Sequence, residues 1–426
     1  MKRILLVLFS LSVFHFSFGV TRTFDGSTST LWHIATNWSG NVVPTIADDV
    51  IIPTGLTVNI STTISDPNAI CNNLTVSGTG VLNIPGTKTI TINGSVFGNG
   101  AIATTNFVGV FGTLRLRGNN NHTGAFTPNI GGSFYYEGAG TQSVRVTNYG
   151  NLIIAGSGTK LMPTGATFTI SSGLTINAPA DLNIGAGATK TMVVAGNAII
   201  NGDLYNGSSN GNIIRINGNL SGSGRIVFLY SAISELQLYG ASNSIGALSS
   251  LYRANHTVSY LRNGNQTVFG SDEYPNLNIS GSGVKTALGN IACAGASIAA
   301  EFTLGTVTTA SVGQYNFAST GSISIFSGGN NKFDFGSATA KRVDFQGGIT
   351  AYAPLVITGT GLAHYVAVGD VLDFNASSIV HSTGQGTTFD YYGINMGILD
   401  NNKIVYENLI LSGSGNYTLQ NGGILD

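Results

Sequence analysis

The chain has 426 residues, of which 59 are Gly and 9 are Pro, and it is 42% hydrophobic but only 9% charged. The hydrophobic content excludes a disordered chain, and so few charges exclude a surface made of solvent-facing helices. A net charge of -1 supplies no electrostatic field for nucleic acid, so no nucleic-acid partner is expected.

The first segment predicts export. The letters "MKR" precede the apolar run "ILLVLFSLSVFHFSFG", and small and polar residues follow, which is the pattern of a secretory signal peptide over residues 1–19. The run is shorter than the roughly 20 residues that span a bilayer, and no later stretch comes close, so we expect no transmembrane segment in the mature chain. Cys71 and Cys293 make no disulfide framework and are expected to be small buried core residues.

The next segment, residues 20–65, holds both Trp residues. Trp32 and Trp38 stand close in sequence to Asp48 and Asp49, and Trp beside carboxylate binds sugars by stacking and hydrogen bonding. The same residues can cover the open end of a repeat stack, which has no preceding neighbour. Because this segment precedes the repeats, we favour a capping block, with a carbohydrate site as the alternative.

Residues 66–426 show the pattern of short strands. In "NLTVSGTGVLNIPGTKTITINGSV" apolar residues alternate with polar ones, and Gly or Pro-Gly recurs every six to ten residues. No linker of the kind that separates sandwich domains interrupts the mature chain, and the signals recur locally. We therefore predict an all-β, right-handed parallel β-helix, a solenoid, with a string of immunoglobulin-like β-sandwich modules as the alternative.

A longer motif occurs three times, as "YGNLIIAGSGTKL" from Tyr149, "YPNLNISGSGVKT" from Tyr274 and "YENLILSGSGNYT" from Tyr406. Its Leu is predicted to point into the core, and its Gly residues are predicted to turn a corner. Its Asn either extends a ladder of stacked amides or bonds a corner backbone group. Gln142 and Gln266 precede the first two copies at matched distances, so we expect a super-repeat of several coils.

Signals for catalysis are weak. The His residues show no zinc spacing, and no nucleophile motif or phosphate loop is visible. Aspartates gather in the C-terminal third, including Asp370 and Asp373 in "GDVLDFN", and aromatic residues recur beside them. Stacked acids on one face would form a calcium or sugar site, whereas the simpler interpretation is that Asp caps turns while the aromatics pack inside the coil. No cofactor is expected apart from this calcium alternative.

The motif "YxNLxxSGSGxKT" and the block "NWSGNVVPTIADDVIIPTGLTVNI" resemble the repetitive secreted and cell-surface proteins of Bacteroidota-type bacteria. The resemblance implies adhesin-like β-solenoid repeats in a bacterial protein that normally ends in a type IX sorting domain. Here the chain stops about one coil past its third motif, so we expect a C-terminally truncated reading frame, whose open end coil would favour self-association.

These observations predict an exported, noncatalytic structural or adhesin-like protein, secreted or on the cell surface, with glycans or other surface proteins as partners. Two alternatives stay open. One is a polysaccharide-active lyase or hydrolase that uses acids such as Asp370 and Asp373, and the other is a carbohydrate-binding module centred on Trp32, Trp38, Asp48 and Asp49.

Overall fold

A computed structural model describes most of the chain. The described residues are 19–61, 63, 65–107, 110–127, 130–145, 147–162, 167–185, 187, 189–251, 253–298, 300–304, 317–319, 323–325, 332–334, 342–346, 349–351, 355–358, 365–370, 372–374, 379–382, 386–398, 404 and 406–419. Nearly all of the predicted signal peptide lies outside them.

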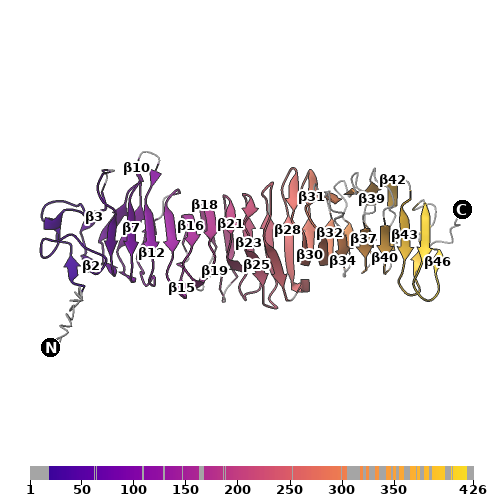
Figure 1. Ribbon diagram of the computed structural model, residues 1–426, viewed down its shortest axis with the longest axis horizontal. Helices are drawn as coiled ribbons and strands as arrows, with labels where there is room; N and C mark the ends of the chain where they lie inside the picture. The colour runs from indigo at the N-terminus through magenta and orange to yellow at the C-terminus, as the bar shows by residue number, and fades with distance from the viewer. Residues whose placement is uncertain are drawn as a thin grey trace, which may run out of the picture.

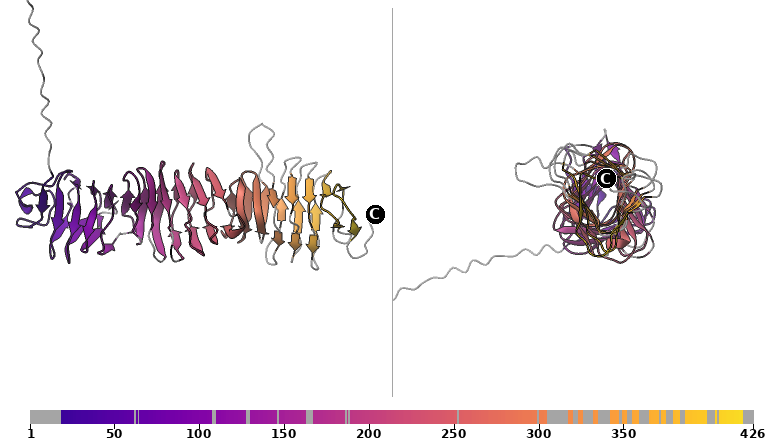
Figure 2. Two further views of the ribbon diagram at one scale, coloured as in Figure 1. Left: turned by 90° about the horizontal axis from the view of Figure 1, so that it is seen from below. Right: turned by 90° about the vertical axis from the view of Figure 1, so that its right-hand side faces the viewer.

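The protein is a rod of stacked coils, with its N-terminal part at one end and its C-terminal part at the other (Figure 1). Viewed along the rod, the coils superpose in one rounded outline (Figure 2). Almost every strand pairs in parallel with its equivalent one coil later, and the one antiparallel strand pair within the described residues joins β10 (Asn106–Phe107) to β11 (Val110–Phe111). The prediction of an all-β parallel solenoid is confirmed, and sandwich modules are not what the structure shows.

The N-terminal coils build three faces. One face is β1 (Thr21–Thr23), β2 (Asp49–Ile52), β5 (Leu74–Val76) and β8 (Val96–Gly98). A second is β3 (Thr57–Asn59), β6 (Val81–Ile84), β9 (Ala101–Thr104) and β13 (Phe126–Thr127). The third is β4 (Ala69–Cys71), β7 (Thr89–Ile92), β12 (Thr113–Leu116), β14 (Ser133–Tyr136) and β16 (Tyr149–Ile154).

The central coils continue this plan. The strands of one face are β15 (Gln142–Ser143), β17 (Gly158–Leu161), β19 (Ala180–Asn183), β22 (Asp203–Tyr205), β25 (Arg225–Phe228) and β27 (Ala247–Ser250). A second face runs from the first half of the long strand β18 (Phe168–Ile176) through β20 (Thr191–Val194), β23 (Asn212–Ile216), β26 (Ser234–Leu238) and β28 (His256–Tyr260). The third face runs from the second half of β18 through β21 (Ala198–Ile200) and β24 (Leu220–Ser221).

The C-terminal coils follow from the long strands β30 (Ser271–Ile279) and β32 (Ile291–Ile298). One face there consists of β29 (Gln266–Val268), β31 (Val284–Ala287), β33 (Glu301–Leu304), β36 (Lys332–Asp334), β39 (Leu355–Thr358) and β42 (Ile379–Ser382). A second face consists of β34 (Phe317–Ser319), β37 (Arg342–Phe345), β40 (Tyr365–Val368), β43 (Thr388–Tyr391) and β45 (Asn408–Leu411). The third consists of β35 (Ile323–Ile325), β38 (Ile349–Ala351) and β41 (Leu372–Phe374). β44 (Gly397–Ile398) pairs with β46 (Thr418–Leu419). Two short 3-10 helices, Ala35–Asn37 and Arg253–Asn255, complete the described elements.

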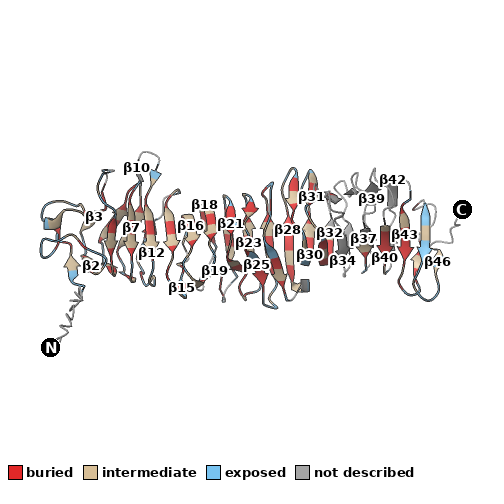
Figure 3. Ribbon diagram, viewed as in Figure 1, coloured by how far each residue is buried: buried red, intermediate tan, exposed pale blue. Residues whose placement is uncertain are grey.

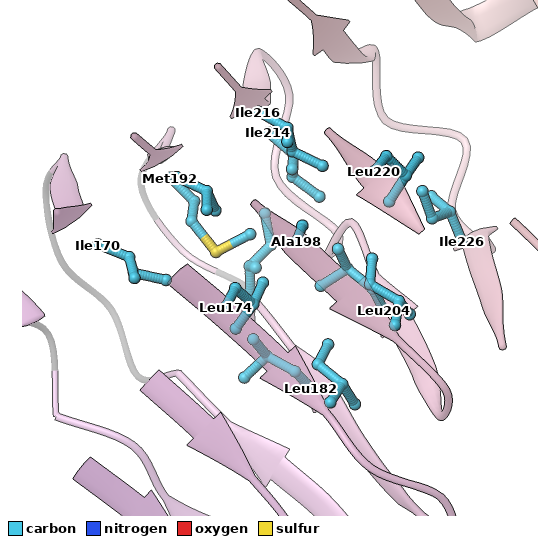
Figure 4. Packing of buried hydrophobic residues seen from close by; sticks show 14 of the residues in the cluster. Ile170, Leu174, Leu182, Met192, Ala198, Leu204, Ile214, Ile216, Leu220 and Ile226 are labelled. Atoms are coloured by element: carbon cyan, nitrogen blue, oxygen red, sulfur yellow. The ribbon is translucent and has the colours of Figure 1, made fainter. Parts of the chain in front are cut away.

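The core is one column along the rod. Buried and half-buried residues alternate along most strands (Figure 3), because successive side chains of a strand point to opposite faces. Inside, each coil places its apolar residues over those of the previous coil, as Leu174, Ala198 and Leu220 do (Figure 4). Both cysteines lie buried in this core outside any disulfide, as predicted.

Close coil-to-coil contact explains part of the glycine content. Gly98 has a φ of +94°, and a Cβ atom at this position would lie 2.0 Å from the carbonyl oxygen of Val76 in the preceding coil. Only glycine combines this left-handed backbone with such an approach.

The first two Tyr-led segments lie where one face ends and a new face starts. β16 pairs with β18 along two stretches, Tyr149 against Ile170 and Leu152 against Leu174, with an irregularity between them. The first half of β18 continues into β20, and its second half continues into β21. One long strand therefore covers two neighbouring faces.

The same transition recurs at the second segment. The face that starts at the first half of β18 runs through β20, β23, β26 and β28, and it reaches the second half of β30. The first half of β32 then starts another face, which runs through β34, β37, β40 and β43 to β45, directly after Tyr406. One super-repeat is therefore the length of chain between two such transitions, at each of which a new face of strands starts.

Candidate functional site: surface hollows and the repeated motif

The two Trp side chains predicted as a cap or a sugar platform are both buried. Their rings pack edge to face with centroids 4.8 Å apart, and Trp38 Nε1 donates a hydrogen bond to the Trp32 carbonyl oxygen at 2.6 Å. Phe24 packs edge to face on Trp38 at 5.1 Å. A sugar stacks only on an exposed ring face, so this arrangement favours packing at the N-terminal end over sugar binding.

The neighbouring carboxylates are occupied by structural hydrogen bonds. Asp48 accepts from the Thr45 backbone N–H at 2.8 Å, from the Thr45 hydroxyl at 2.7 Å and from the Val20 backbone N–H at 3.1 Å. Burial acts to raise the pKa of Asp48, but these hydrogen bonds, with help from Arg22, outweigh it and lower the pKa. Asp49 accepts from the side chains of Asn72 and Asn73, each at 2.9 Å.

The C-terminal acids lie far along the rod from this pair. Asp370 is exposed just after β40, and the backbone of Asp373 lies in β41 opposite Thr350 of β38. Two other aspartates of this region accept hydrogen bonds from later coils, Asp344 from the Tyr392 hydroxyl two coils later at 2.8 Å and Asp390 from the Ser412 hydroxyl of the next coil at 2.5 Å. Across the described part of the chain, no three His, Cys, Asp or Glu side chains come together in a way that could hold a metal ion. Calcium binding stays a prediction.

The repeated motif builds a polar pair of tyrosines in the core. The hydroxyl oxygens lie 3.0 Å apart for Tyr136 and Tyr149, 2.6 Å for Tyr260 and Tyr274, and 2.7 Å for Tyr391 and Tyr406. In each pair the second tyrosine begins the motif, and the first ends the strand one coil earlier. Burial raises the pKa of Tyr149 and Tyr274 well above the usual range, so these hydroxyls stay protonated as donors.

The Lys of the motif is buried as well, which sequence reasoning missed. Lys160 Nζ donates to the carbonyl oxygens of Gly138, Gly140 and Ser157, each at 2.8 Å. Lys285 Nζ does the same to Arg262, Gly264 and Ser282, at 2.6, 2.8 and 2.8 Å. The third copy has Tyr417 at this position, and its hydroxyl donates to the carbonyl oxygens of Tyr391 at 3.0 Å and Gly393 at 3.3 Å.

Gln and Asn of the super-repeat hold corner backbone groups. Gln142 Oε1 accepts from the Gly138 backbone N–H at 2.8 Å, and Gln266 Oε1 accepts from the Arg262 backbone N–H at 3.3 Å. The motif Asn side chains donate to carbonyl oxygens of the preceding coil, Asn151 to Gly131 at 3.1 Å and Asn276 to Ala254 at 2.9 Å. Of the two predicted roles for this Asn, the bond to a corner backbone group is the one observed.

Two of the hollows on the surface of the described chain lie near the first motif and in the central coils. One is a groove of about 340 Å³ across four neighbouring strands, lined by Ser133, Asn151, Ile153, Ser172, Gly173, Leu174, Thr175, Asn197 and Ile199. The other, of about 460 Å³, lies between two corner loops and is lined by Ser208, Asn210, Leu229, Tyr230, Ser231 and Ala232. Neither hollow contains a residue that the sequence singled out for binding, although the groove contains the motif Asn151.

Comparison with known proteins finds a match to a family model in the N-terminal part of the chain. Residues 23–108 match the model of a domain of unknown function, DUF8693. The matched segment contains Trp32, Trp38, Asp48 and Asp49. No curated protein and no solved structure matches the chain. Among the described residues, no helix has the length and apolar character needed to cross a membrane.

Proposed function

We propose that the protein is an exported, noncatalytic structural or adhesin-like protein that presents a stiff rod at the cell surface or in the extracellular space. The observation that carries the proposal is the use of the repeated motif. The Tyr, Lys and Asn side chains of the motif, and the Gln that precedes it, form hydrogen bonds with neighbouring coils inside the rod or at its corners. The repetition therefore serves to link each coil to the next.

A continuous core supports a mechanical role. The buried residues form one cluster from Phe24 at the N-terminal end to Ile404 near the C-terminal end. Each coil adds about 4.8 Å to the length of such a stack and contacts only its neighbours. A rod of this kind holds its outward-facing side chains at fixed spacing, which suits repeated weak contacts with a surface or matrix.

Export is tested with a reporter. Residues 1–25 are fused to an alkaline phosphatase that becomes active only outside the bacterial cytoplasm, and we expect an active fusion. A Leu8→Arg variant, which places a charge in the apolar run, should leave the enzyme inactive inside the cell. An inactive wild-type fusion would refute export.

The noncatalytic assignment is tested separately from export. Purified protein is incubated with neutral and acidic polysaccharides, and reducing ends and unsaturated products are measured. We expect no products. Product formation that is lost in an Asp370→Asn or Asp373→Asn variant would instead support the polysaccharide-active enzyme.

A further inference from the structure

The larger hollow lies between two corner loops that stack on one another. Residues 206–211 connect β22 to β23, and residues 229–233 connect β25 to β26 one coil later. Backbone hydrogen bonds join the loops at both ends, from Asn206 N–H to Val227 O at 3.2 Å and from Gly211 N–H to Ile233 O at 2.7 Å. The walls of the hollow are therefore tied to the rigid stack.

A difference in side-chain size creates the hollow. The first loop reads "NGSSNG" and the second reads "LYSAI", so small residues stand next to Leu229 and Tyr230. Gly207 and Gly211 have φ values of +68° and +78°, a left-handed backbone that keeps this loop small. Space is left beside the Tyr230 ring, to a volume of about 460 Å³.

Exposed apolar side chains lie at the same corners as the hollow. Tyr230 is 40% exposed, Ile233 is 64% exposed, and Leu251 of the following loop is 71% exposed. Leu251 lies over Leu229, because its N–H donates to the Phe228 carbonyl oxygen at 3.2 Å. Leaving such side chains in water forfeits the free energy of burying them, so their presence together at these corners favours a binding site here.

The lining supplies neutral hydrogen-bonding groups. Asn210 Oδ1 accepts from the Ile233 backbone N–H at 3.0 Å, which fixes the amide and leaves its Nδ2 hydrogens as donors to a ligand. Ser208 and Ser231 add hydroxyl groups. Asn255 Nδ2 donates to the Ser231 carbonyl oxygen and ties this loop to the next one. The six lining residues carry no charge at neutral pH.

We propose that this hollow binds a neutral glycan, with a sugar ring stacked on Tyr230 and its hydroxyl groups bonded to Asn210, Ser208 and Ser231. A sugar offers an apolar C–H face and a rim of hydroxyl groups, which matches an exposed aromatic ring beside an amide and two hydroxyls. An acidic glycan would need a cation, and the lining holds none. The proposal deepens the adhesin-like function, on which it rests, by naming the class of ligand.

The experiment is affinity electrophoresis of the purified full-length protein in gels that contain a neutral polysaccharide, either a β-glucan, a mannan or a xylan, or acidic alginate. We expect at least one neutral polysaccharide to retard the protein and alginate to leave it unaffected. Tyr230→Ala should weaken the apparent affinity about fivefold or more, and Tyr230→Phe, which keeps the ring, should retain most of it.

Phe97 gives a matched control, since it is 39% exposed on β8, far from the hollow along the chain. Phe97→Ala should bind like the wild type, as should Gly173→Gln, which fills the groove at the first motif. Lack of retardation in all neutral gels would overturn the proposal, and so would unchanged binding of Tyr230→Ala or a loss in either control. The export reporter does not involve the hollow, so a failure here and a failure of export are distinguishable.

Discussion

The hydroxyl oxygens of Tyr260 and Tyr274 lie 2.6 Å apart in the core, one coil apart along the rod. Tyr274 also donates to the Phe269 carbonyl oxygen at 2.7 Å, so the two hydroxyl groups form a short chain that ends on the backbone. The equivalent tyrosines of the first copy do the same, with Tyr149 bonded to Tyr136 and to the Arg145 carbonyl oxygen. A buried polar chain of this kind is stable only when every member has a partner, which explains why the two tyrosines recur together.

A Tyr274→Phe variant should therefore be less stable by about 1 to 3 kcal/mol, because it removes the donor to a buried carbonyl oxygen and the partner of Tyr260. The loss is measured by urea unfolding followed by far-UV circular dichroism. Tyr230→Phe is the matched control, because the Tyr230 side chain is exposed, and it should unfold like the wild type. Equal stability of Tyr274→Phe and the wild type would show that the pair contributes little.

Much of the fold was predictable because one physical rule governs it. Alternation of apolar residues in "NLTVSGTGVLNIPGTKTITINGSV" predicts inward side chains such as Leu74 and Ile90, and both are fully buried. Within β17 the same alternation turns Lys160 inward and leaves Leu161 exposed. The general expectation that Lys faces solvent hides this signal.

The hollow beside Tyr230 was not predictable in the same way. It depends on which loops become neighbours in the stack, a relation between residues about one coil apart, such as Asn210 and Ile233. A strand pattern shows which side chains face inward within one strand, but it does not show which corner lies against which. The transfer of the stack from face to face at β18 and β30 escaped prediction for the same reason.

Stability should rise with pH between about pH 8 and pH 10 because of Lys285. Burial, with Arg262 adding to it, lowers the pKa of Lys285 from 10.5 to about 8. In this range the unfolded chain binds more protons at this site than the folded chain, so raising the pH favours folding. Above pH 10 the sign reverses, because unfolded tyrosines ionise while the pKa of buried Tyr274 stays well above 10.0.

The measurement for Lys285 is the urea midpoint as a function of pH. A Lys285→Met variant has no titrating group at this site, so it should lack most of the rise between pH 8 and pH 10. An exposed lysine would keep its usual pKa and would not give this slope. A wild-type profile that is flat or falling over this range would contradict the argument.

Trp38→Ala tests whether the N-terminal residues act by packing. Trp38 is buried against Trp32 and Phe24, so we expect a loss of about 3 to 5 kcal/mol, as for other large-to-small core changes. Because a stack is stabilised by contacts between neighbouring coils, hydrogen exchange should increase most strongly in β1 to β3. Intact protection there, combined with loss of binding to neutral glycans, would support the alternative of a sugar site at Trp38.

Gly173 and Gly196 lie in neighbouring coils and differ in how much space a side chain would have. A Cβ atom on Gly196 would lie 1.5 Å from the carbonyl oxygen of Ser172, whereas one on Gly173 would meet nothing closer than the Asn197 carbonyl oxygen at 3.3 Å. Gly196→Ala should therefore force the two coils apart and cost about 1 to 3 kcal/mol or more.

Gly173→Ala should be tolerated to within about 1 kcal/mol, because Gly173 lines the groove and its methyl group would meet the Asn197 carbonyl oxygen only at 3.3 Å. Thermal unfolding of the two variants side by side gives the comparison, and the wild type sets the reference. If both variants were equally destabilised, the glycine at 173 would be needed by the long strand β18 itself. A larger loss of stability in Gly196→Ala than in Gly173→Ala would mean that Gly196 sets the spacing between coils, whereas Gly173 leaves space in the groove.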